Sequence, residues 1–220
     1  MATAKKARTD KAELAATGLT PTMDLVYQAL ETEIGGVEVY RMALRCAQNE
    51  DLRDEWTKYL RQTEQHVERV REACETLRDR VRGALCAGEV PVVLGGDHSI
   101  AIGTVGGIAE HYRERGEQIG LIWVDAHADM NTPESSPTGN VHGMPLAVIL
   151  GMGEASLVGM GGFAPKVQPH HVALIGIRDL DEKEKEIVRR SGVNAFTMRD
   201  VDERGMSAVI QEAIAKVSAG

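Results

Sequence analysis

Two short clusters of histidine and aspartate contain the side chains whose types and spacing could do chemistry. GGDHS places Asp97 and His98 after two glycines, and DAHADMN holds Asp125, His127 and Asp129. Imidazole nitrogens and carboxylate oxygens together suit a hard-to-borderline divalent ion such as manganese. A pair of such ions lowers the pKa of water and supplies a strong nucleophile at neutral pH. We therefore expect a metal site that can activate water.

A purely structural origin of the two clusters is the main alternative. Aspartate and histidine near the ends of strands often cap loops or form salt bridges, and a single Asp-x-His would indicate little. Four ionisable residues on adjacent strand ends are harder to explain in this way, because burying them without a metal or an ion partner would be costly. The two motifs together favour the metal site.

The elements that must position these clusters are predicted from apolar runs. Each cluster follows one such run, Val90–Leu94 for the first and Ile119–Val124 for the second. If the chain stays extended after the second run, the period of two sends the three ionisable residues of DAHADMN to one side. The first cluster would face them from a neighbouring strand.

Further apolar runs alternate with helical stretches along the second half of the chain. Strands are also expected at His171–Ile177 and Val193–Phe196, and helices at Ile100–Arg115, Met144–Leu150, Glu182–Arg190 and Met206–Ser218. This alternation predicts an α/β fold with βαβ units and a parallel sheet. Ligands of such sheets bind at the carboxyl ends of the strands, where both clusters fall.

Residues 20–77 have a helical pattern throughout and are predicted to form a long helical hairpin. Thr20 and Pro21 are a typical N-cap and first helical residue, and a second helix is expected to begin near Asn49. We expect residues 1–19 to be a flexible tail and residues 78–220 to be a partial α/β domain.

The hairpin resembles half of a ferritin-like helical domain. Glu31 and Glu38 share one face, and His66 lies on the facing helix. A di-iron site needs a Glu-x-x-His pair, but Thr63 occupies the first position of that pair. The favoured interpretation is therefore a solvated charged face around an apolar seam.

Composition limits the compartment and the partners. The 220 residues carry a formal net charge of −8, which argues against nucleic acid or an anionic membrane surface as the main partner. Three cysteines without a Cys-x-x-Cys spacing indicate reduced thiols. No secretory signal and no membrane span are predicted, so we expect a cytoplasmic protein.

Four blocks of the sequence resemble successive blocks of the arginase family, a group of ureohydrolases. They are GGDHSIAIGTVGG, WVDAHADMNTPESSPTGNVHGMP, IGIRDLDEKE and FTMRDVDERGM, and they keep the family order. The resemblance runs from about Leu77 to the C-terminus, and GNVHGMP favours arginase over agmatinase-like relatives. It implies a three-layer arginase-like fold, two Mn²⁺ ions, L-arginine as substrate, and L-ornithine and urea as products. Arginase relatives commonly form trimers or multiples of them, so a homo-oligomer is expected.

The resemblance also implies a role for each matching position. His98, Asp125 and Asp129 would bind one manganese ion, and His127 with a bridging Asp125 would bind the other. Asp129 and His142 are assigned to catalysis, with His142 as the proton shuttle. The substrate's α-carboxylate would be held by Asn131, Thr138 and Asn140, and its α-amino group by Asp181 with Glu184 nearby.

Two of these roles have structural alternatives. His142 could be a packed or capping histidine, and only its motif favours the proton shuttle. Asp181 precedes the predicted helix at Glu182 and could be its N-cap, a role that is compatible with substrate binding.

The family also has a later strand that ends in an Asp-x-Asp pair and completes both metal sites. This sequence reaches Gly220 without such a block. Asp200 and Asp202 belong to the FTMRDVDERGM block, and Asp179 and Asp181 belong to the substrate block, so neither pair is a replacement. We therefore expect an incomplete fold, an incomplete second metal site, weak metal binding, little hydrolysis and a tendency to self-associate.

Three functions of different classes follow from the sequence. The first is an arginase, which the motifs favour most. The second is a noncatalytic protein that keeps a partial arginase fold for binding or assembly. The third is a ferritin-like metal-handling module that carries the α/β part as a passenger.

Overall fold

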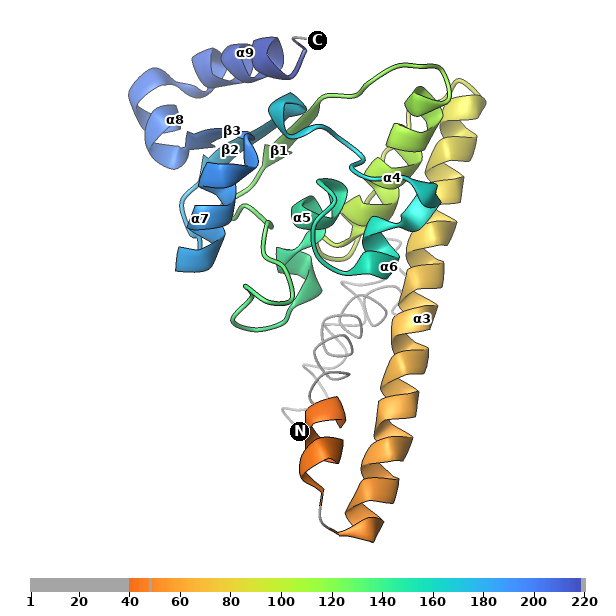
Figure 1. The fold of residues 1–220 in the computed structure, drawn as a ribbon. Helices are drawn as coiled ribbons and strands as arrows, with labels where there is room; N and C mark the ends of the chain where they lie inside the picture. Colours follow the sequence, from red (N-terminus) through yellow and green to blue (C-terminus); the bar gives the residue numbers. More distant parts are fainter. Residues whose placement is uncertain (1–39, 48, 219–220) are drawn as a thin grey trace, which may run out of the picture.

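The computed structural model of the protein describes residues 40–47 and 49–218 (Figure 1). The predicted tail and most of the first predicted helix lie outside these residues. A short helix at residues 40–46 precedes the labelled elements. These are α3 (Glu50–Cys86), α4 (Ile100–Arg113), β1 (Leu121–Val124), η1 (Val141–Gly143), α5 (Pro145–Ile149), α6 (Ala155–Val158), η2 (Met160–Gly162), η3 (Pro169–His171), β2 (Val172–Ile177), α7 (Glu182–Ser191), β3 (Asn194–Thr197), α8 (Met198–Arg204) and α9 (Met206–Val217).

A parallel sheet of order β1-β2-β3 lies at the centre of the α/β part. All six residues of β2 are buried, as expected for a strand with neighbours on both sides and helices on both faces. The predicted α/β fold and parallel sheet are thus confirmed.

Helices cover the two faces of the sheet and make three layers. On one face, Trp123 and Leu174 pack with residues of α4 and α5. On the other face, Ile175 and Phe196 pack with apolar residues of α8 and α9. The sheet is therefore the middle layer of a helix–sheet–helix arrangement, which Figure 1 shows from the side.

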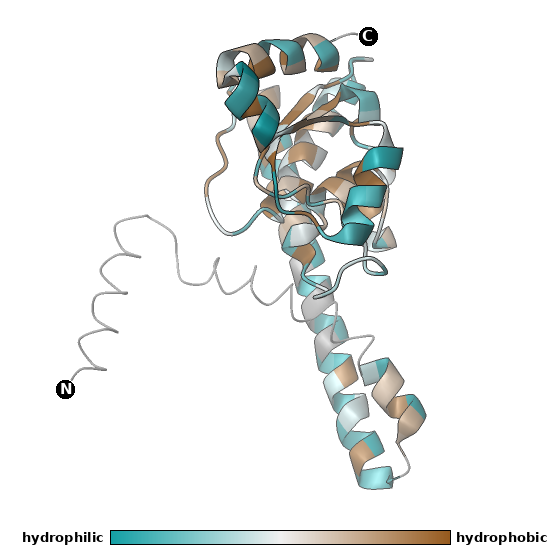
Figure 2. Cartoon of the chain, turned by 90° about the vertical axis from the view of Figure 1, so that its left-hand side faces the viewer, coloured by the Kyte–Doolittle hydropathy of each residue, from teal (hydrophilic) through white to brown (hydrophobic). Residues whose placement is uncertain are grey.

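The long helix α3 begins where the sequence predicts. The side chain of Asn49 accepts hydrogen bonds from the backbone N–H groups of Asp51 and Leu52 and so caps the helix. The helix then continues through Leu77 to Cys86, so the predicted boundary between hairpin and α/β domain falls inside one continuous helix. Figure 2 shows its N-terminal half extending away from the α/β part, beside the helix at residues 40–46.

The proposed iron-ligand pattern of the hairpin cannot be placed. Glu31 and Glu38 lie outside the described residues, and so do the side chains of Thr63 and His66. Of the helices that are described, none combines the length and the apolar character needed to cross a membrane.

The predicted strand at Val90–Leu94 is wrong. The segment has no strand assignment, and the sheet of the described residues consists of β1, β2 and β3 alone. Val90, Val92 and Leu94 are 88%, 79% and 82% exposed. The alternation of side chains has the period of a strand, but a strand also needs a neighbour for its backbone hydrogen bonds, and none lies beside this segment within the described part of the chain.

Candidate metal centre

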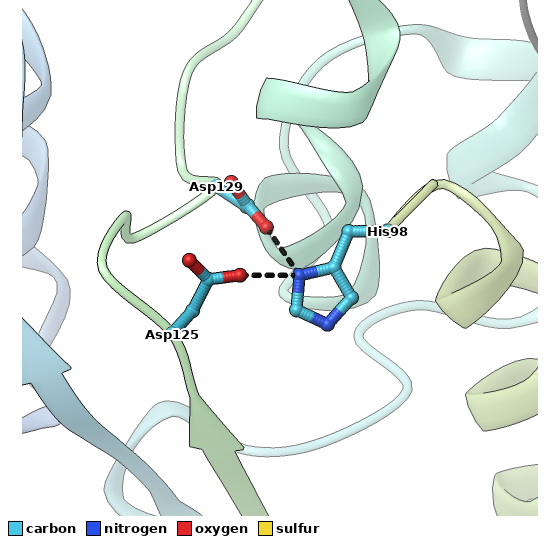
Figure 3. Close-up of side chains that lie close together, drawn as sticks. All are labelled: His98, Asp125 and Asp129. Carbon is cyan, nitrogen blue, oxygen red and sulfur yellow. Dashed lines mark ion pairs between the residues drawn. The ribbon is translucent and has the colours of Figure 1, made fainter. Parts of the chain in front are cut away.

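One imidazole nitrogen and two carboxylate oxygens converge after β1 and before α4 (Figure 3). The Nδ1 atom of His98 lies 2.8 Å from Oδ2 of Asp125 and 2.8 Å from Oδ2 of Asp129. Potential ligand atoms of these three residues all lie within 4.8 Å of one another. Asp129 is buried, whereas Asp125 and His98 are partly exposed, so the cluster is reachable from solvent.

The donor set suits a divalent cation better than a network of hydrogen bonds. Nδ1 of His98 carries at most one proton, so it cannot donate well to two carboxylates at once. Oδ2 of Asp129 is buried and lacks a well-directed hydrogen bond, although Nδ1 of His98 is close to it. A contact that is short but misaligned stabilises the two groups only weakly. A cation among two oxygens and a nitrogen would satisfy all three atoms.

His98 is held by an aromatic ring and by a local turn. Its imidazole stacks on the indole of Trp123 in β1, with ring centroids 4.0 Å apart. Oδ1 of Asp97 accepts hydrogen bonds from the backbone N–H and the hydroxyl of Ser99. Asp97 thus shapes the entry to α4, which explains why the ionisable residue beside His98 does not join the cluster.

Asp129 reaches the cluster because its backbone leaves the extended conformation. Its φ is +51°, in the left-handed region that non-glycine residues seldom adopt. Its carbonyl oxygen accepts hydrogen bonds from the backbone N–H groups of Leu146 and Ala147 at the start of α5. These contacts stabilise the unusual conformation and fix the direction of the side chain.

The close contacts shift the pKa values of all three residues. The close contact with the Asp129 carboxylate raises the pKa of His98, with further support from the charge of Asp125. Burial raises the pKa of Asp129, and contact with His98 offsets only part of this effect. Burial also tends to raise the pKa of Asp125, but the N–H of His127 and the two imidazoles lower it overall. Two carboxylates around one histidine therefore leave a local excess of negative charge that favours a cation.

His127 lies beside the cluster rather than in it. Its Nδ1 atom is 3.2 Å from Oδ1 of Asp125, the carboxylate oxygen that faces away from His98. Its side chain is 56% exposed, and Nε2 lies 3.7 Å from Oδ2 of Asp179. One carboxylate, that of Asp125, therefore lies between the two histidines.

Two of the predicted substrate-binding residues meet directly. Nδ2 of Asn131 donates to Oδ2 of Asp181 over 3.2 Å, and Oδ1 of Asn131 accepts from the hydroxyl of Ser135. Asp181 occupies the N-cap position of α7, yet its side chain makes no capping hydrogen bond. Of the two roles foreseen for this carboxylate, capping by the side chain is therefore wrong.

Glu184 lies in the interior instead of facing a cavity. It is 4% exposed, and Oε1 accepts a hydrogen bond from the backbone N–H of Met130 over 2.9 Å. It belongs to the same group of contacts as Asn131 and Asp181, but its carboxylate is turned toward the backbone of the loop.

The remaining predicted site residues lie on the segment between the loop that follows β1 and α5. They are Thr138, Asn140 and His142. The hydroxyl of Thr138 accepts from the backbone N–H of Asn140, which makes a local turn. His142 is half-buried in η1, and the next residue, Gly143, accepts a hydrogen bond from the N–H of Asn131. Backbone contacts therefore join this segment to the loop that carries Asn131.

Three residues at the site were not foreseen from the sequence. Trp123 stacks on His98, Ser135 fixes the side chain of Asn131, and Asp179 lies near His127. All three stand within the quoted blocks, but the spacing of Ser135 carries no signal, and that of Asp179 indicates only an Asp-x-Asp pair with Asp181. Trp123 is buried in β1, and its apolar pattern does not distinguish it from other core residues.

A parallel α/β sheet with a His–Asp–Asp cluster at the carboxyl end of one strand defines a three-layer α/β protein with a candidate metal site. Residues 28–220 match the arginase family. The chain belongs to that family.

Several arginases are similar to this chain in sequence and in structure. The arginase of Bacillus caldovelox is 51% identical over 150 residues, which are 68% of this chain and 49% of that protein. Its solved structure has a TM-score of 0.63 over 67% of this chain and 48% of that chain. A Bacillus subtilis arginase structure has 48% identity and a TM-score of 0.64, over 68% of this chain and 50% of that chain. An Entamoeba histolytica arginase, solved in complex with L-ornithine, has 35% identity and a TM-score of 0.61, over 66% of this chain and 49% of that chain. This chain spans about half the length of these relatives.

Proposed function

We propose that this chain provides the manganese-binding and substrate-recognising part of an arginase, which hydrolyses L-arginine to L-ornithine and urea. The observation that carries the proposal is the convergence of His98, Asp125 and Asp129 on one point. Membership of the arginase family supplies the reaction, and the L-ornithine complex of the Entamoeba histolytica relative supports the substrate class.

The proposed metal ligands are His98, Asp125 and Asp129, with His127 as a ligand of a second ion that shares Asp125. When bound, Mn²⁺ supplies Lewis-acid activation of water for attack on a guanidinium carbon. Oxygen and imidazole donors suit this ion, and the excess negative charge of the two carboxylates would also favour a cationic guanidinium nearby.

The proposed substrate contacts come from the loop after β1 and from the start of α7. Neutral side chains of Asn131, Thr138 and Asn140 would donate hydrogen bonds to the α-carboxylate without cancelling the negative charge of the cavity. The carboxylate of Asp181 would accept from the α-amino group. The imidazole of His142 would deliver a proton to the departing amine, because histidine exchanges protons near neutral pH.

A noncatalytic binding role is the second candidate, and the number of ligands favours it. Within the described residues, three donors converge on one point, while His127 contacts Asp125 from the opposite side. A site with few protein ligands binds metal weakly, so we expect this chain alone to release little urea. It would then serve mainly for binding or assembly.

A manganese titration of the purified chain with a urea assay tests both candidates. We expect Mn²⁺ to bind, and Asp129→Asn to lower the affinity by at least about tenfold, because the variant loses an anionic ligand. Glu182→Gln is the matched control, since this exposed glutamate pairs with Lys185 and lies outside the site.

The two readouts separate the possible results. Urea release that requires Mn²⁺ and disappears in Asp129→Asn would establish an arginase. Mn²⁺ binding without urea release would establish the binding role. Equal Mn²⁺ affinity of Asp129→Asn and the unaltered chain would exclude this cluster as the metal site.

Compartment and assembly complete the proposal. Cys46, Cys74 and Cys86 are all free thiols, which supports a reducing compartment such as the cytoplasm. We also propose that the chain self-associates, as a trimer or a multiple of one.

A further inference from the structure

Glu184 joins two segments of the candidate site that are far apart in sequence. Its carboxylate accepts the N–H of Met130, 54 residues earlier, and also a hydrogen bond from the backbone of Asp181 at the start of its own helix. The residue is 4% exposed, so the carboxylate is directed at the protein's own backbone and away from solvent. Burial raises its pKa, and the nearby carboxylates of Asp129 and Asp181 add to that rise.

The N–H that donates a hydrogen bond to Glu184 belongs to Met130, which lies between two site residues. Met130 follows Asp129, which faces the cluster, and precedes Asn131, which meets Asp181. The side chain of Met130 is fully buried, so its backbone has no access to water as a substitute partner. Without Glu184 this loop would keep its backbone contacts to α5 and to Gly143 and the hydrogen bond of Asn131 to Asp181, but the N–H of Met130 would lose its partner in α7.

We propose that Glu184 is a positioning residue that fixes the loop at Met130, and thereby holds Asp129 toward the metal and Asn131 toward Asp181. This role deepens the proposed function and rests on it for the identity of the metal. It differs from the substrate-binding role, near the α-amino group held by Asp181, that the family resemblance implies for Glu184. A carboxylate that is buried against backbone N–H groups acts through the loop that it orders.

Three variants separate the positioning role from a role of charge. Glu184→Gln keeps an acceptor oxygen for the N–H of Met130 but removes the charge. Glu184→Ala removes both. Glu182→Ala is the matched control, because it removes a glutamate from the same helical turn, where the side chain is 89% exposed and pairs with Lys185.

Hydrogen exchange of the metal-free chain gives the first readout. We expect the Met130 amide to be protected in the unaltered chain and in Glu182→Ala. It should exchange at least about tenfold faster in Glu184→Ala, with most of the protection retained in Glu184→Gln. Circular dichroism checks that each variant is folded. If Glu184→Ala does not fold, the comparison of Glu184→Gln with the unaltered chain still tests the contact. An unprotected Met130 amide in the unaltered chain would overturn the inference.

Mn²⁺ affinity and the electron paramagnetic resonance spectrum of bound Mn²⁺ give the second readout. We expect Glu184→Ala to bind Mn²⁺ about 10- to 100-fold more weakly, with an altered spectrum. Glu184→Gln should stay within about threefold of the unaltered chain, because the hydrogen bond is rescued.

Two results would contradict the positioning role. Equal Mn²⁺ affinity and equal Met130 exchange in Glu184→Ala and the unaltered chain would show that the loop does not depend on Glu184. Equal losses of L-ornithine binding in the Gln and Ala variants, with Mn²⁺ binding intact in both, would show direct substrate contact through charge. If the unaltered chain binds no Mn²⁺, the proposed function fails, while the exchange experiment still decides the role of Glu184.

Discussion

At the scale of single residues, charge is concentrated where the fold limits access to water. His98 faces two carboxylates, and Asp129 among them is nearly buried. A folded chain tolerates such an arrangement when the groups share a proton or a cation. The cluster therefore lowers the stability of the folded state without an ion. The same arrangement favours binding of a divalent cation.

Lys166 is the second residue at which charge and burial conflict. It is 8% exposed, and its Nζ atom donates to the carbonyl oxygens of Val158 and Phe163 while it lies 4.4 Å from the centroid of the Phe163 ring. Burial lowers the pKa of Lys166 to about 8, and the charge of Arg78 contributes to the shift. The folded state thus holds the proton of this ammonium group less strongly than the unfolded state does.

The pH dependence of stability should reveal this buried amine. Below about pH 8 the amine is protonated in both the folded and the unfolded state, and the penalty of burying the charge is complete. Between that pH and the ordinary lysine value the folded state releases its proton while the unfolded state keeps it, so stability rises with pH. The free energy of unfolding, relative to that of Lys166→Met, should increase from pH 7 to pH 10 by at most about 3 kcal/mol. Lys185→Met, at an exposed position, should show no such change, and a flat difference for Lys166 would refute the assignment.

At the scale of elements, α4 packs against α3 through glycines. A Cβ atom on Gly103 would lie 2.6 Å from the carbonyl oxygen of Cys74, and one on Gly107 would lie 2.4 Å from that of Arg78. Ion pairs of Arg82 in α3 with Glu110 of α4 and with Glu114, the residue after α4, flank this contact. Because glycine has no side chain, the two helices can approach closely at these positions. The long helix α3 thereby supports α4, which begins just after His98.

Alanine substitutions at two adjacent glycines should have opposite effects. Gly107→Ala should lower the free energy of unfolding by about 1–3 kcal/mol, because the new methyl group meets backbone that cannot move freely. Gly106→Ala is the matched control, since its Cβ would meet only the side chain of Arg78, at 3.8 Å. It should be neutral or stabilising by up to about 1 kcal/mol, because alanine favours the helix. Chemical denaturation measures both, and equal effects would show that the helices do not pack as described.

At the scale of the whole molecule, an apolar surface remains uncovered near the candidate site. Val90, Val92 and Leu94 are at least 79% exposed, and Val124 at the end of β1 is 60% exposed. The segment leads to His98 and the strand leads to Asp125, two residues of the candidate metal site. Exposed apolar side chains in such number favour association with other surfaces.

Replacing these side chains should therefore weaken self-association of the chain. In a triple variant with serine at residues 90, 92 and 94, the dissociation constant of self-association should rise at least about tenfold. The reason is that less apolar surface is buried on contact. Sedimentation velocity over a range of concentrations measures the effect. Serine at Met206 and Ile214, which are about half exposed on α9, is the control. A triple variant that associates as strongly as the unaltered chain would exclude this surface as the contact.

Local pattern was sufficient to predict most elements of the α/β part. The expected strand at His171–Ile177 corresponds to β2, and the helix expected from Glu182 corresponds to α7 within one residue at its end. Helix and strand propensity and apolar periodicity act over a few residues, so they can be recognised from the sequence alone. The types of the candidate metal donors could be recognised in the same way, since His98 and the aspartates stand in two compact motifs.

Only the tertiary structure decided which of these donors meet. An extended chain after Val124 would have placed His127 with Asp125 and Asp129, but the chain bends at residues 125–127 and turns left-handed at Asp129, so the alternation is lost. Its conformation depends on hydrogen bonds from α5 and on the contact of Glu184 with the adjacent Met130, which come from distant parts of the chain. The sequence by itself thus determined the chemical identity of the donors and the elements around them. Their convergence, the exposure of Val90–Leu94 and the burial of Glu184 depend on long-range contacts, which a pattern of period two or 3.6 does not encode.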